Sequence, residues 1–189
     1  RRSLVEIALL VLLLVGWFIL PGSPMLWTLV VLGFIAFPWL FAAVLAILQP
    51  PTDQSLQAYY GAVARDIMAN AEQFGLAVTF LPHQAWVSAD AIVRTLNRLY
   101  ITRRHMLEWQ TASQVERAMR RGGDREVYRR MWPAVAIGAF AAAGAIFEVY
   151  SGDAGLGVDS LALIATIPLA FLWIVSPSIA AAMSAPAIP

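Results

Sequence analysis

The residues best suited to chemistry lie between Trp86 and Trp109. Asp90 and Arg94 form an acid-then-base pair four residues apart, in the order that favours an ion pair on a helix. One interpretation is that the pair only supports its helix. The other is that it holds a guanidinium group toward a hydroxyl or a carboxylate of a ligand.

Further arginines and aromatic residues surround this pair. Aromatic rings can stack on a sugar ring, and guanidinium groups can donate hydrogen bonds to its hydroxyls. The candidate binding residues are Trp86, Asp90, Arg94, Arg98, Tyr100, Arg103, Arg104, Glu108 and Trp109. The same residue types also suit a membrane surface, where arginines mark topology and contact lipid, and tryptophans act as interfacial anchors. Both interpretations stay open at this point.

No catalytic or metal-binding residue is predicted within the chain. The sequence has no glycine-rich phosphate loop, no H-E-x-x-H motif, no nucleophile elbow and no paired carboxylates placed around a substrate. It has no cysteine, and its two histidines, His83 and His105, are too few for a histidine-rich metal centre. A lone histidine of this kind is usually structural.

The composition is that of a membrane protein. Of the 189 residues, 60% are hydrophobic and 13% are charged, whereas soluble domains are about 45–50% apolar and about 25% charged. This excludes disorder, a disulfide scaffold and most soluble enzymes. All basic residues are arginines, and apart from Arg1 and Arg2 they lie between Arg65 and Arg130. Such a distribution indicates a membrane protein with one basic side, and no nucleic-acid partner is expected.

Four apolar runs predict the spans of an all-α membrane protein, with four transmembrane helices arranged as two hairpins. The runs cover residues 4–20, 25–48, 131–147 and 161–175, and the last can extend to Met183. Residues 1–48 are the first hairpin, turning at Pro21–Pro24, and 131–189 are the second hairpin with a C-terminal tail. Pro38 predicts a kink in the second run. Proline is tolerated in the first turn of a helix, which suits Pro133.

One face of the third run is built of small residues. Ala134, Gly138, Ala142 and Ala145 recur at helical spacing. Small side chains allow two helices in a membrane to approach closely. We therefore expect another helix to pack against this face.

Residues 49–130 are predicted to be amphipathic helices at the cytosolic membrane interface, which join the two hairpins. A first helix has apolar residues at three-to-four spacing and is expected between Asp53, a candidate N-cap, and Gly75, a candidate stop. A second helix is expected from Pro82 to about Arg121, with Gly122-Gly123 ending it. A short helix capped by Asp124 then leads into the third run.

The arginine distribution orients the chain. Cytoplasmic loops of membrane proteins carry an excess of Lys and Arg. The segment 49–130 holds eleven arginines against eight acids, whereas the loop 148–159 holds acids and no cation. Both termini and residues 49–130 are therefore predicted to be cytosolic.

The stretch 81–116 reads LPHQAWVSADAIVRTLNRLYITRRHMLEWQTASQVE. It resembles bacterial cyclic β-1,2-glucan synthases, in which a DAI-RTL-RL block is followed by arginines and a LEW-TA block. The matching residues are Asp90, Ala91, Ile92, Arg94, Thr95, Leu96, Arg98, Leu99, Arg103, Arg104, Leu107, Glu108, Trp109, Thr111 and Ala112.

This resemblance implies a bacterial inner-membrane enzyme with the present chain as its membrane part, following the glucosyltransferase domain. The implied partners are the lipid bilayer, a growing β-glucan chain, and two domains of the same polypeptide, a cytosolic glucosyltransferase domain and a phosphorylase-like domain. UDP-glucose and a divalent metal, Mg or Mn, are expected on the transferase domain, and no cofactor is expected on this chain. Its implied role is to anchor the transferase domain and help position the acceptor glucan, without catalytic residues of its own.

A different class of function stays open beside this one. The chain also suits a non-enzymatic four-span scaffold or a transporter module whose basic cytosolic loop binds anionic lipid or a partner protein. A transporter is expected to carry polar or broken helices at the midplane of the bilayer, and apart from Pro38 and Pro168 these runs offer little of that. A start codon close upstream would favour this alternative, and a preceding transferase domain in the same gene would favour the synthase.

Overall fold

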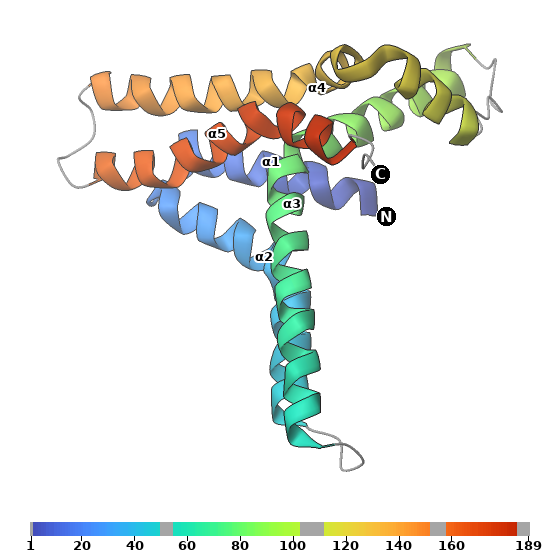
Figure 1. Cartoon of the computed structure of the whole chain (residues 1–189). Coiled ribbons are helices and arrows are strands. Elements are labelled where there is room, and N and C mark those ends of the chain that lie inside the picture. Colours follow the sequence, from blue (N-terminus) through green and yellow to red (C-terminus); the bar gives the residue numbers. More distant parts are fainter. Residues whose placement is uncertain (1, 50–54, 103–111, 152–157, 185–189) are drawn as a thin grey trace.

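The computed structural model describes residues 2–49, 55–102, 112–151 and 158–184. These ranges contain helices and no strand, which confirms the all-α class (Figure 1). The elements are α1 (Arg2–Phe18), α2 (Pro24–Leu48), α3 (Leu56–Asn97), the π-helical turn η1 (Arg98–Thr102), α4 (Ala112–Ser151) and α5 (Val158–Ser184).

Within the described ranges, three helices are long and apolar enough to cross a membrane. They cover Pro24–Leu48, Arg125–Glu148 and Ala162–Ser184. The first helix is apolar over Leu4–Phe18 but is shorter than these three. The chain is therefore a multi-pass membrane protein by length and composition, while the predicted number of four spans is not confirmed.

The turn between α1 and α2 forms where the sequence predicts it. Gly22 has a φ of 110°, a left-handed conformation that glycine adopts without a steric penalty. The next residue, Ser23, caps α2 by accepting a hydrogen bond from the backbone N–H of Leu26 at 3.3 Å. After this turn, α1 and α2 pack closely against each other. A Cβ added to Gly16 of α1 would lie only 2.6 Å from the Cβ of Trp27 in α2.

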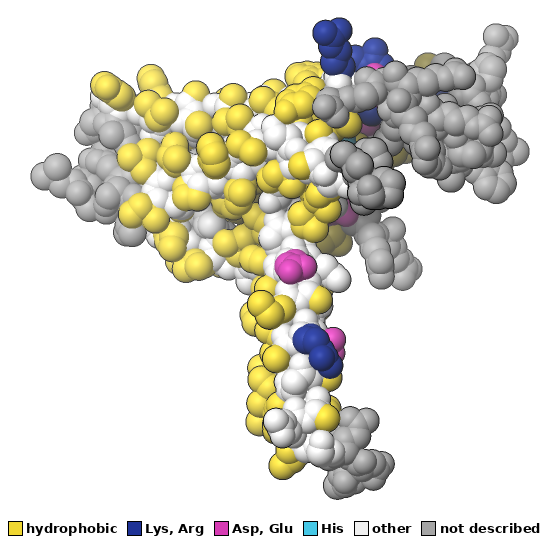
Figure 2. Space-filling view, viewed as in Figure 1, with side chains coloured by type: hydrophobic (Ala, Val, Ile, Leu, Met, Phe, Trp, Pro, Cys, Tyr) yellow, Lys and Arg dark blue, Asp and Glu magenta, His cyan; other side chains and the backbone are white. Residues whose placement is uncertain are grey.

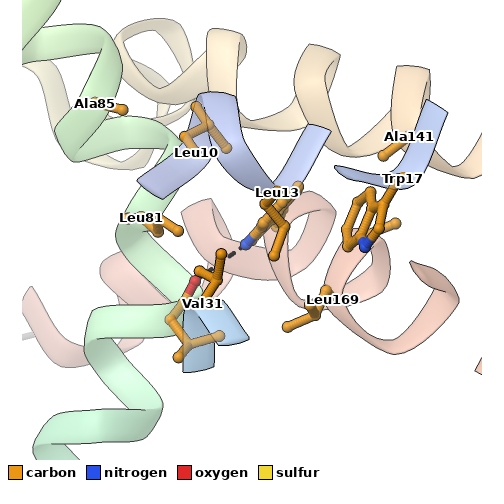
Figure 3. Close-up of a cluster of buried hydrophobic side chains, with 11 residues drawn as sticks. Leu10, Leu13, Trp17, Val31, Leu81, Ala85, Ala141 and Leu169 are labelled. Carbon is orange, nitrogen blue, oxygen red and sulfur yellow. Dashed lines mark hydrogen bonds between the residues drawn. The ribbon is translucent and has the colours of Figure 1, made fainter. Parts of the chain in front are cut away.

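All five α-helices contribute to one buried apolar core (Figure 3). Leu13 and Trp17 of α1 lie in its middle, and the Trp17 ring stacks on Trp173 of α5 with 5.8 Å between ring centroids. The helix α3 adds Val78, Leu81 and Ala85 to the core. The predicted arrangement of two hairpins joined by interfacial helices is not confirmed, since part of α3 lies in one core with α1 and α5.

The small-residue face of α4 packs on α5, as predicted. A Cβ added to Gly138 would lie 2.9 Å from the carbonyl oxygen of Ala170, so the two helix backbones are nearly in contact. Ala134, Ala141 and Ala145 are buried, whereas Ala142 is only partly buried. This packing needs a side chain no larger than a hydrogen atom at position 138.

The predicted breaks at Gly75 and Pro82 are wrong, because α3 runs through both. A helical glycine costs only about 1 kcal/mol relative to alanine. Burial of Val78 and Leu81, which follow Gly75 along the helix, offsets this cost. Pro82 is itself fully buried, and another helix satisfies the carbonyl group that it frees.

Further helix boundaries also differ from the predictions. The helix expected to continue to Arg121 ends at Asn97, and η1 follows it. The Gly122-Gly123 pair and Pro133 lie inside α4 rather than at a helix end, because a continuous helix tolerates each of these residues when its neighbours remain hydrogen-bonded. Asp53 lies outside the described residues, and Ser55 is the residue that precedes α3. The extension of the last run is confirmed, since α5 ends at Ser184.

Part of the chain projects from the bundle as an arm, which we define as residues 34–48 of α2 and 56–74 of α3. Figure 1 shows α2 bending and then running beside the first half of α3, across the direction of α4 and α5. Pro38 accounts for the bend, because its ring removes one helical hydrogen bond and clashes with the carbonyl group four residues earlier. The two helices of the arm are joined near its tip by Tyr59, whose hydroxyl donates to the carbonyl oxygen of Ala46 at 2.8 Å.

Candidate functional site

The structure describes five of the nine predicted binding residues. Trp86, Asp90 and Arg94 lie on the second half of α3, and Arg98 and Tyr100 lie in η1. The remaining four fall outside the described residues: Arg103, Arg104, Glu108 and Trp109. The predicted binding role of all nine stays a prediction.

Three of these residues share one face of α3. Trp86, Asp90 and Arg94 follow one another at four-residue spacing, which places them in a row along a helix. The Nε of Arg94 donates to Oδ1 of Asp90 at 2.8 Å, and both side chains reach solvent, with exposed fractions of 69% and 39%. The pair thus has the geometry expected of an ion pair that supports its helix. Both side chains are also partly exposed to solvent.

Trp86 meets an aromatic residue that the sequence did not single out. Its ring contacts Trp132 of α4 edge to face, with 6.0 Å between centroids, and about half of each side chain is exposed. The sequence pattern predicts Trp132 only as a member of the apolar run 131–147. Its position directly after Arg129, Arg130 and Met131 was the available signal, because a tryptophan beside arginines marks the edge of a membrane span.

The same part of α4 carries a cluster of charged residues. Glu126 accepts hydrogen bonds from Arg129 and from Arg130, each at 2.9 Å. Beside them, the hydroxyls of Tyr128 and Ser178 lie 2.7 Å apart and link α4 to α5. Figure 2 shows arginine side chains gathered at this end of the bundle, which is the end where α1 begins and α5 ends.

We call these groups of α3 and α4, which meet at the contact between Trp86 and Trp132, the shelf. It consists of Trp86, Asp90, Arg94, Glu126, Arg129, Arg130 and Trp132. It offers two aromatic rings, partly exposed guanidinium groups and the partly exposed carboxylate of Asp90, on two helices that share a packed core. The side chain of Glu126 is only 16% exposed. Such a surface can bind a hydroxylated ligand by stacking and hydrogen bonding.

The π-helical turn places Tyr100 away from the packed core. Its side chain is 73% exposed, and the neighbouring Ile101 is similarly exposed. The π-turn follows α3 directly, and such turns often occur at functional sites because they change the direction of the side chains that follow. Tyr100 is therefore available to a ligand or to the membrane surface, but no described contact joins it to the shelf.

His83 lies one turn before Trp86 along α3, and burial lowers the pKa of its imidazole. Its Nδ1 is buried without a hydrogen-bond partner among the described residues. Both observations favour the neutral ring, because a buried charge lacking a partner is costly. The surroundings of His83 thus agree with the structural role expected of a lone histidine.

Comparisons with known proteins give a specific similarity. No protein-family model matches the chain. Over 181 residues, 95% of this chain, it is 33% identical to the "Cyclic beta-(1,2)-glucan synthase NdvB" of Rhizobium meliloti (strain 1021). The chain spans only 6% of the length of that relative. The resemblance to cyclic β-1,2-glucan synthases is thereby confirmed, and it extends over nearly the whole chain rather than only over residues 81–116.

Proposed function

From this similarity we propose that the chain is a membrane segment of an inner-membrane cyclic β-1,2-glucan synthase, where it anchors the transferase domain and helps position the acceptor glucan. The observation that carries the proposal is the 33% identity over 181 residues. The proposal includes a transferase domain outside this chain that uses UDP-glucose with Mg or Mn. It also includes a phosphorylase-like domain on the same polypeptide.

The single core supports a positioning role. A polymerising transferase must hold the end of its acceptor toward the donor, and correct placement supplies a large share of catalysis. The shelf residues sit on α3 and α4, and both helices contribute buried residues to the same core. A glucan bound there would be held relative to the membrane spans by packed helices rather than by a loop.

The charge distribution supports a cytosolic shelf. The arginine-containing start of the apolar part of α4, Arg125–Glu148, lies at the same end of the bundle as the start of α1 (Figure 1). By the positive-inside rule this end faces the cytosol. A cytosolic transferase domain would then lie on the side of the membrane where the shelf is exposed.

The proposal is tested in the intact synthase, in membrane vesicles supplied with labelled UDP-glucose. Trp86→Ala and Trp132→Ala are each expected to raise the acceptor KM, by about 10-fold if stacking contributes about 1.4 kcal/mol. The matched control is Phe147→Ala, which removes an exposed aromatic ring from the other end of α4. Protein in the membrane is quantified for each variant, so that lower expression is not mistaken for lower activity.

Two results would contradict the proposal. If both tryptophan variants make glucan with the KM of the parent protein, the shelf does not contact the acceptor. If the transferase domain makes glucan at the same membrane-associated rate after deletion of this segment, the segment does not anchor it. Trp109 is a predicted binding residue outside the described residues, and the same KM measurement on Trp109→Ala tests its contact with the acceptor.

A further inference from the structure

The arm exposes far more apolar surface than a helix pair in water would. Its α2 half contains no charged residue, and only 6% of the apolar window of α2 is buried. The large exposed side chains on this half are Phe34, Phe37, Leu40, Phe41, Val44, Leu45, Ile47 and Leu48. Exposed apolar patches of this extent mark an interaction surface.

The α3 half of the arm has two different faces. Val63 is buried, and Ile67 and Phe74 line a cleft against α2, whereas Arg65 and Glu72 are exposed. Figure 2 shows the hydrophobic side chains of the arm gathered on the side that continues the hydrophobic surface of the bundle, with charged side chains on the other side. The arm is therefore amphipathic across its width, as helices at a membrane surface are.

The depth of the arm follows from contacts in the bundle. α3 enters the bundle at Val78, whose carbonyl oxygen accepts from Trp173 of α5 at 3.0 Å. Five residues further along α5, Ser178 pairs with Tyr128, the neighbour of Arg129. At 1.5 Å per residue, these two levels are about 7 Å apart along α5. The arm thus leaves the bundle about 7 Å inside the arginine level, the depth at which amphipathic helices lie in a leaflet.

The seam of the arm between residues 36–43 and 67–74 is suited to a hydrocarbon chain. A cleft of about 240 Å³ lies between α2 and α3, with Trp39, Leu40, Ile67 and Phe74 among its walls. Its walls are almost entirely apolar, so water in it would find few hydrogen-bond partners. An acyl chain, in contrast, needs no such partner.

We propose that the arm lies in the plane of the membrane, half-inserted into the leaflet on the arginine side, with lipid acyl chains against its α2 face. α2 then crosses the bilayer only up to its bend and continues along the interface. The apolar surface of the arm is continuous with the lipid-facing surface of the bundle, and its charged face meets headgroups and water. This inference does not depend on the glucan assignment, since it requires only a membrane around the bundle.

The absence of cysteine in the chain allows a direct test. Single cysteines replace Phe37, Phe41, Val44 and Leu48, which lie on one face of α2 and are exposed. Each variant of the intact protein, with any cysteine outside this chain replaced, is nitroxide-labelled and reconstituted in bilayers. Its depth is measured from accessibility to oxygen and to a water-soluble nickel complex. Labels at Trp132, Phe140 and Phe147 of α4 are the matched control for an upright helix.

We expect equal depth at all four arm positions, with high oxygen and low nickel accessibility. Arg65→Cys, on the charged face, is expected to be accessible to nickel. The α4 labels are expected to change in depth by about 22 Å over their fifteen residues. A steady change of about 16 Å from position 37 to 48 would show an upright span and overturn the proposal. Nickel access at all four positions, or exclusion of both reagents by a covering protein domain, would overturn it as well.

Discussion

The indole N–H of Trp173 donates a hydrogen bond to the carbonyl oxygen of Val78 at 3.0 Å. In a regular helix this carbonyl would accept from the N–H of residue 82, but residue 82 is a proline and has none. Ser176 acts in the same way within α5, since its hydroxyl donates at 2.8 Å to the carbonyl oxygen of Trp173, which Pro177 leaves free. The buried prolines at 82 and 177 are therefore tolerated because side chains replace the missing donors.

Replacing Trp173 with Phe is expected to destabilise the protein by about 1–3 kcal/mol, because the buried carbonyl of Val78 loses its donor. Pro82→Ala restores a backbone N–H to that carbonyl. The cost of Trp173→Phe should therefore be smaller by about 1 kcal/mol in the Pro82→Ala background. The measurement is a double-mutant cycle of unfolding free energies in detergent. Equal costs in the two backgrounds would show that the bond does not compensate for the proline.

A second buried tryptophan bond predicts a difference between two substitutions of Thr28. The hydroxyl of Thr28 accepts from Nε1 of Trp17 at 2.8 Å and donates to the carbonyl oxygen of Pro24. Thr28→Val keeps the shape but leaves the indole N–H unpaired, at an expected cost of about 1–3 kcal/mol. Thr28→Ser keeps the hydroxyl and should cost clearly less. The melting temperatures of the two variants provide the measurement. If both variants lose the same stability, the hydrogen bond between Trp17 and Thr28 does not contribute to it.

Gly138 is expected to tolerate no side chain. A Cβ at this position would lie 2.9 Å from a backbone oxygen of α5, so Gly138→Ala must push α4 and α5 apart, at about 1–3 kcal/mol. Gly33→Ala is the matched control, because a Cβ there meets nothing within 4 Å. The melting temperatures of the two variants provide the measurement. A Gly138→Ala protein as stable as the control would contradict the close contact.

The imidazole of His83 predicts a pH dependence of stability. Burial lowers its pKa in the folded protein below the unfolded value of about 6.5. The unfolded chain therefore binds this proton more readily, so the free energy of unfolding is retained above about pH 6.5 and falls as the pH drops below it. Melting temperatures between pH 7.5 and 5.5 should decline less in His83→Gln than in the parent protein. If the melting temperatures of the two proteins decline equally, groups other than His83 cause the pH dependence.

The ion pair between Asp90 and Arg94 is expected to contribute little to stability. Both side chains are solvent-exposed, and pairs of this kind on a helix contribute about 0.3–0.5 kcal/mol. Arg94→Gln should therefore unfold at nearly the same temperature as the parent protein. A loss of glucan synthesis in that variant, at unchanged stability, would assign Arg94 to ligand contact. A large loss of stability would instead assign it to the fold.

The sequence alone determined the class of this protein, because apolar runs and clustered arginines depend only on local composition. The turn at Gly22 and the small-residue face around Gly138 were also predictable, since each rests on the backbone or size of residues close in the chain. The resemblance carried by residues 81–116 indicated the family of the relative that is 33% identical to the chain.

Tertiary structure decided where the helices end and which residues of different helices are in contact. Pro82 predicts a helix end when only its neighbours are considered, and it lies inside α3 because Trp173, 91 positions away in the chain, satisfies the carbonyl of Val78. The pairing of Trp86 with Trp132 also depends on how α3 meets α4. Such relationships arise from contacts between segments that are distant in the chain. Hydrophobic periodicity shows which face of a helix is buried, but it does not predict which segment packs against that face.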